Sequence, residues 1–181
     1  MNATAVWLRR AGRGTAADGS ILTWSMAEGA RGSRWREARL RDGALVSSLL
    51  LELDSSGAFS HLELSTASGL LTLHPEGDQT IHGNAVDAGG VRHIVAVPWL
   101  PDDILLVAGS PTSRAAAARR SDAVEPDGVP RPRGVGIGVV VGLDLSVERR
   151  AVGRSERTTS LDADGLPGFG DGVTWPLELE T

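Results

Sequence analysis

Three histidines stand in a segment of alternating apolar residues, where strand pairing could bring their imidazoles together. His61, His74 and His82 each follow or precede a leucine or isoleucine. If the leucines of neighbouring strands share one face, strand parity places His61 opposite His74 and His82 diagonally beside it, within about 7–8 Å. Three imidazoles are the ligands that catalytic zinc sites use, with water in the fourth position. The spacing therefore predicts a candidate metal site at His61, His74 and His82.

The same histidines fit a second interpretation. The metal site assumes two cross-strand pairs, Leu64 with Leu71 and Leu73 with Ile81. Without those pairs, the imidazoles are separate solvated groups on the polar face of a sheet, and His61 faces Glu52 across the preceding hairpin. Both interpretations place the histidines on the face opposite the leucines.

Tryptophan and arginine supply the other candidate binding residues. Trp24, Trp35, Trp99 and Trp175 lie in or beside apolar runs, in a chain with two Phe and no Tyr. Indoles at such positions either fill a core or line a ligand cavity, where the N–H can donate a hydrogen bond. Arg34, Arg36, Arg39 and Arg41 could contact an anionic headgroup at the mouth of that cavity, or form a solvated strand face.

The elements that must position these residues are mainly strands. From Gly43 to Val97, runs in which every second residue is apolar alternate with turn residues, which predicts a β-meander. Further strands are expected over residues 21–26, 92–97, 104–108, 135–147, 158–161 and 173–179. Residues 31–41 fit either an exposed strand, which we favour, or a short helix. One short helix is expected after Ser110, with Ser110 as cap, Pro111 in the first turn and an alanine run behind. The predicted fold is mainly β: a curved antiparallel sheet, either a spiral β-roll or an open barrel, with one short helix.

Composition limits the partners and the domain organisation. The 181 residues fit one domain, and the net charge of −5 disfavours nucleic acid. The chain has no Cys, so thiol chemistry and disulfides are excluded. We expect a loose arm over residues 1–20, a single β domain over 21–181, and an exposed proline-rich connector over 121–134. No signal peptide and no apolar run long enough for membrane insertion is recognised, so a cytoplasmic location is expected.

The chain shows no pattern typical of a catalytic centre. The glycines of GVGIGVVVG, residues 134–142, alternate with Val and Ile and predict a strand rather than a phosphate loop. No Gly-any-Ser-any-Gly elbow is present, and the acidic groups Asp102–Asp103 and Asp162, Asp164 and Asp171 are typical of turns. We therefore expect no enzymatic activity and no cofactor, and the oligomeric state stays open.

One segment resembles a known family. The run LLLELDSSGAFSHLELSTASGLLTLHPEGDQTIHGN, together with TTSLDADGLPGFGDG and the early Trp24, is similar to the bacterial family of glycolipid-binding proteins. The resemblance covers roughly residues 21–180. It implies a spiral antiparallel β-structure whose concave surface holds an amphiphilic lipid. The resulting hypothesis is non-enzymatic binding of an apolar or glycolipid-like amphiphile, and the alternatives are the histidine metal site and a protein-interaction β domain.

Overall fold

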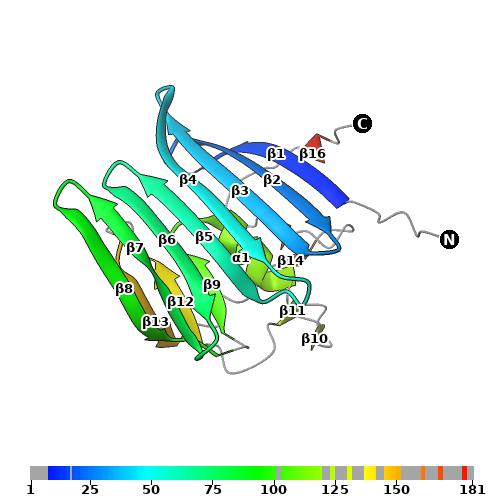
Figure 1. The fold of residues 1–181 in the computed structure, drawn as a ribbon. Helices are drawn as coiled ribbons and strands as arrows, with labels where there is room; N and C mark the ends of the chain where they lie inside the picture. Colours follow the sequence, from blue (N-terminus) through cyan, green and yellow to red (C-terminus); the bar gives the residue numbers. More distant parts are fainter. Residues whose placement is uncertain are drawn as a thin grey trace.

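A computed structural model of the chain describes residues 8–16, 18–100 and 103–119. It also describes short stretches at 123–124, 130–131, 137–141, 145–151, 160–161, 167–168 and 177–178. These residues form mainly β-structure with one short helix, as the alternating pattern predicts (Figure 1). The main sheet is antiparallel and is not closed into a barrel.

Eight consecutive strands build the sheet as a meander, each strand pairing with the next in the sequence. They are β1 (Leu8–Thr15), β2 (Ile21–Gly29), β3 (Gly32–Arg41), β4 (Ala44–Leu53), β5 (Phe59–Thr66), β6 (Gly69–Glu76), β7 (Thr80–Asp87) and β8 (Gly90–Pro98). The short strand β16 (Leu177–Glu178) pairs with the outer edge of β1.

A second layer lies behind one face of this sheet (Figure 1). It contains β9 (Ile104–Val107), α1 (Pro111–Arg119), β12 (Ile137–Val141) and β13 (Val147–Ala151). Strand β12 pairs parallel with β9 and antiparallel with β13. Two small ladders complete the described elements: β10 (Ala123–Val124) with β11 (Pro130–Arg131), and β14 (Ser160–Leu161) with β15 (Pro167–Gly168). Within the described chain, no helix is long and apolar enough to cross a bilayer.

The hydrophobic core lies between the sheet and the second layer. Two rows of cross-strand neighbours supply most of its sheet side: Trp24, Glu37, Leu49, Leu64, Leu71 and Ala85 in one row, and Met26, Trp35, Leu51, Leu62, Leu73, Gly83 and Ile94 in the other. Leu105, Val107, Ala115 and Leu145 pack against these rows from the second layer. The leucine rows of successive hairpins thus share one buried face, as the period of two predicts.

Local sequence sets the hairpins and the helix. Asp42 and Gly43 join β3 to β4 with φ angles of 51° and 79°, the left-handed backbone that a two-residue Asp-Gly turn requires. Helix α1 begins as expected, because the Ser113 N–H donates to Ser110 Oγ at 3.1 Å. The buried Glu37 of β3 also accepts hydrogen bonds from Ser110 Oγ, at 2.7 Å, and from the Thr112 N–H, at 3.1 Å. The N-terminus of α1 is thereby attached to the sheet.

The loose arm expected over residues 1–20 is wrong for Leu8–Thr15, which form β1. This strand contains few bulky apolar residues, and at Gly12 the missing side chain makes room for its neighbour: a Cβ there would lie 2.4 Å from Nε1 of Trp24. The rest of the arm before Leu8 lies outside the described residues, and so does most of the expected connector over 121–134.

Candidate functional site

The two faces of the main sheet carry different residues. One face is the core, and the other, which we call the open face, is not covered by α1, β9, β12 or β13 (Figure 1). On the open face of β2 to β5, several of the alternate positions carry small side chains. Thr23, Ser25, Ala38, Ser48 and Ser65 occupy them. Short side chains in the middle of a broad sheet leave room above the strands.

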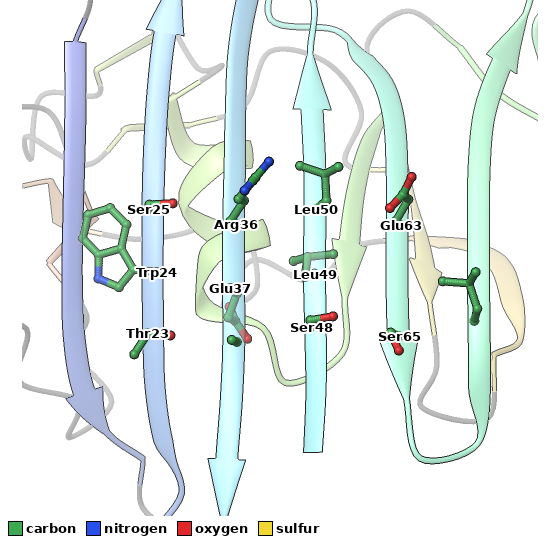
Figure 2. A pocket seen from close by; sticks show the side chains of 12 residues that line it. Thr23, Trp24, Ser25, Arg36, Glu37, Ser48, Leu49, Leu50, Glu63 and Ser65 are labelled. Carbon is green, nitrogen blue, oxygen red and sulfur yellow. The ribbon is translucent and has the colours of Figure 1, made fainter. Parts of the chain in front are cut away.

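A hollow of about 530 Å³ occupies this part of the open face. Its walls come from five neighbouring strands, and Figure 2 shows the lining side chains from close by. The lining residues are Thr23, Trp24, Ser25, Arg36, Glu37, Ala38, Ser48, Leu49, Leu50, Glu63, Ser65 and Leu70. We call this the serine hollow, because Ser25, Ser48 and Ser65 line it. Its volume falls in the range of about 300–1,000 Å³ that is usual for small-molecule sites.

One row across the serine hollow combines both charges with an apolar side chain. Arg36 pairs with Leu50, and Leu50 pairs with Glu63, so the three side chains lie side by side on β3, β4 and β5 (Figure 2). Glu63 is hydrogen-bonded through Oε1 to Nε2 of His61 at 3.1 Å. The row can donate hydrogen bonds from a guanidinium, accept them on a carboxylate, and contact a carbon skeleton between the two.

An exposed apolar row leaves the serine hollow at its β6 side. Leu70 pairs with Val86, and Val86 pairs with Val91, so the three side chains continue along one line across β6, β7 and β8. They are 40%, 39% and 60% exposed, respectively. An apolar side chain exposed singly is ordinary, but a contiguous row beside a hollow is typical of a binding surface.

The tryptophans expected to line a ligand cavity lie in the core, where the structure describes them. Trp24 is among the lining residues of the serine hollow, but it is 5% exposed, belongs to the core row and packs over Gly12. Trp35 and Trp99 are 1% and 5% exposed and belong to the core, where Trp99 meets the ring of Phe59 edge-on at 5.5 Å. Trp175 lies outside the described residues. The three tryptophan side chains that the structure describes thus belong to the core rather than to the open face.

The histidines lie on the open face, as strand parity predicts, but in a different register from the one assumed. Leu64 pairs with Leu71 as expected, whereas Leu73 pairs with Gly83 rather than Ile81, so His74 lies directly opposite His82. The difference arises from the β6–β7 turn, where Glu76 pairs with Thr80 and Gln79 adopts the left-handed backbone with φ of 64°. A shift of two residues keeps every side chain on its face.

The three imidazoles do not form a common ligand set. His61 lies opposite Glu52, and Nε2 of each histidine bonds to a side chain two residues away on its own strand: Glu63 for His61, Glu76 for His74 and Thr80 for His82. In the part of the chain that the structure describes, no group of three or more His, Asp or Glu side chains is placed to hold a metal ion.

The arginines of β3 differ in their partners. Arg34 forms an ion pair with Glu52, with 2.5 Å between NH2 and Oε1. Arg39 and Arg41 both lie against Asp18, and Arg39 also donates to the carbonyl of Gly109.

The pKa of the Asp18 carboxyl is lowered to about 2, mainly by hydrogen bonds from the hydroxyl and N–H of Ser20 and further by the charge of Arg41. Asp18 therefore stays ionised beside Arg39 and Arg41. Among the described residues, Arg36 has no such carboxylate partner, so its guanidinium is available to a ligand in the serine hollow.

Comparison of the chain with protein-family models, curated proteins and solved structures gives no match. The resemblance to glycolipid-binding proteins therefore stays a hypothesis.

Proposed function

We propose that this protein binds a glycolipid-like amphiphile on the open face of its sheet, without catalysing a reaction. In this proposal, the sugar headgroup occupies the serine hollow and the alkyl chain lies along Leu70, Val86 and Val91. The observation that carries the proposal is the direct continuity of a hydroxyl-lined hollow with an exposed apolar row, since Leu70 belongs to both.

The chemistry of the serine hollow suits a sugar. Each sugar hydroxyl both donates and accepts hydrogen bonds, and the hollow offers serine and threonine hydroxyls, which do the same. Arg36 adds a charged donor and Glu63 a charged acceptor on either side of Leu50. Hydrogen bonds to charged groups contribute more than neutral ones, so this row can orient the headgroup.

The apolar row accounts for the second half of the ligand. Each methylene removed from water contributes about 0.8 kcal/mol, so a chain lying on several exposed valine and leucine side chains supplies affinity without directional contacts. The row runs across the strands, away from the serine hollow. A ligand with a polar and an apolar end matches this division, whereas a free sugar would leave the row uncovered.

The alternative functions have less support. The three histidines are separate groups bonded within their own strands, and most of the connector that a protein-interaction domain would use lies outside the described residues. We therefore develop only the amphiphile-binding proposal.

The proposal is tested with dodecyl maltoside, a neutral sugar amphiphile, below its critical micelle concentration. Calorimetric titration and native mass spectrometry should both show binding to the wild-type chain. Ser48→Trp fills the middle of the serine hollow and should abolish this binding. Ser68→Trp makes the same change in the exposed β5–β6 turn and should leave it intact.

A folded Ser48→Trp variant that binds like the wild type would contradict the proposal. Circular dichroism checks the fold of each variant. If Ser48→Trp does not fold, Leu70→Asp replaces it, because Leu70 is already 40% exposed and its substitution interrupts the apolar row at the hollow. Unchanged affinity in that variant would equally overturn the proposed site.

A further inference from the structure

A second hollow of about 490 Å³ adjoins the serine hollow on the open face and shares Ser25 and Arg36 with it. Its lining is rich in arginine and otherwise small: Arg9, Arg10, Ala11, Ser25, Met26, Ala27, Arg34 and Arg36. We call this the arginine hollow. It spans β1, β2 and β3, at the end of the sheet away from the apolar row.

The strand register directs three of these arginines to the same face. Arg9 and Arg34 are the two cross-strand neighbours of Ala27, and they flank its methyl group from β1 and β3. Arg36 follows two residues after Arg34 on β3, so its side chain emerges on the same face. Adjacent strands are about 4.8 Å apart and two residues along a strand cover about 6.6 Å, so the three arginines start from positions around Ala27 and Ser25, and all three line the hollow.

The positive charge of the arginine hollow is only partly neutralised. Glu52 pairs with Arg34. No carboxylate of the described chain bonds to Arg9 or Arg36, and both side chains are exposed. The chain as a whole carries a net charge of −5, so a local excess of cations runs against its average composition. Like charges held around one hollow favour an anionic occupant.

We propose that the arginine hollow binds a phosphate group carried by the headgroup of the amphiphile. This inference deepens the proposed function and rests on it for the position of the headgroup. Guanidinium groups present paired N–H donors that match the oxygens of a phosphate, and they remain charged at all physiological pH values. Because the two hollows share Arg36 and Ser25, one ligand can place its sugar in the serine hollow and its phosphate in the arginine hollow.

The test compares two amphiphiles with the same alkyl chain, dodecyl phosphate and dodecyl maltoside, by calorimetric titration. Arg9→Gln removes a guanidinium that lines the arginine hollow but not the serine hollow. It should weaken dodecyl phosphate binding about tenfold, the equivalent of about 1.4 kcal/mol, and leave dodecyl maltoside binding unchanged. Arg31→Gln makes the same charge change in the exposed β2–β3 turn and should alter neither affinity.

A third titration uses inorganic phosphate, both alone and as a competitor of dodecyl phosphate. Competition that disappears in Arg9→Gln supports the phosphate site. Binding of inorganic phosphate that depends on Arg9, with no binding of either amphiphile, supports the phosphate site with free phosphate as ligand and overturns the proposed function. Equal affinity of wild type and Arg9→Gln for dodecyl phosphate, with dodecyl maltoside still bound, overturns the phosphate site and leaves the proposed function standing.

Discussion

Replacing Glu37 with alanine should detach the N-terminus of α1 from the sheet and lower the free energy of unfolding. Glu37 is 7% exposed and lies on the core face of β3. Its Oε2 accepts hydrogen bonds from Ser110 Oγ and from the N–H of Thr112, two donors that are themselves buried. A carboxylate at this position also faces the positive end of the helix dipole.

The size of the effect follows from these contacts. A hydrogen bond to a charged group contributes about 1.5–3 kcal/mol, and a buried donor left without an acceptor costs about 1–3 kcal/mol. Because the Ser110 hydroxyl and the Thr112 N–H both lose this acceptor, we expect a total loss of about 2–4 kcal/mol for Glu37→Ala. Glu37→Gln keeps an acceptor oxygen and loses only the charge, so it should cost about 1 kcal/mol.

Denaturant unfolding, followed by circular dichroism, measures both variants against Glu63→Ala. Glu63 is a carboxylate of the same sheet with a side chain that is 51% exposed, so its removal should change the unfolding free energy by no more than about 0.5 kcal/mol. If Glu37→Ala and Glu63→Ala lower the free energy of unfolding by equally small amounts, the attachment of α1 through Glu37 is refuted. A loss in Glu37→Gln as large as in Glu37→Ala would show that charge, rather than the acceptor oxygen, dominates.

Two further predictions concern single positions. The pKa of Asp18, about 2, lies below its usual value of 3.8, so the stability that its ionised form adds is present above about pH 4 and lost as the pH falls toward 2. Ser20→Ala should raise this pKa in an NMR titration, and an unchanged value would contradict the assignment of its cause. Gly83→Ala should cost about 2 kcal/mol or more in denaturant unfolding, because the new Cβ would lie 1.8 Å from the carbonyl oxygen of Thr72. Gly77→Ala, where the Cβ meets open space, is the control and should be nearly neutral.

The sequence predicts those elements of the fold that a local pattern, such as alternation or helix capping, determines. Alternation of leucine with polar residues predicts β4, β5 and β6, and the buried rows confirm which face each residue takes. The helix is recognisable because Ser110 and Pro111 stand before an alanine run, and both occupy the expected places. Strand β1 has no such signal, because its glycines and alanine are typical of a loop. Only the structure shows that the indole of Trp24 lies over Gly12.

The candidate site could not be predicted from any single segment of the sequence, because its lining residues come from five strands. Large aromatic residues are obvious candidates for a binding site, yet Trp24, Trp35 and Trp99 are buried in the core. The serine hollow is made by small residues that are unremarkable one by one and meet only when five strands are in register. The signal that could have identified them is the run of Ser, Thr and Ala at alternate positions opposite the leucines. The register itself depends on turns, as the left-handed Gln79 demonstrates.

The same strand pairing that buries the leucines also builds the proposed binding face. Side chains alternate between faces, so each residue that fixes the core, such as Leu49, places its neighbours Ser48 and Leu50 on the open face. A slip of one residue in any hairpin would move polar groups into the core and leucines into the hollow, which makes the site as strongly specified as the core itself. Residues of the open face lie outside the buried core, so their substitution should change stability less than substitution of the buried leucines. Variants such as Ser48→Trp and Arg9→Gln can therefore report on binding separately from folding.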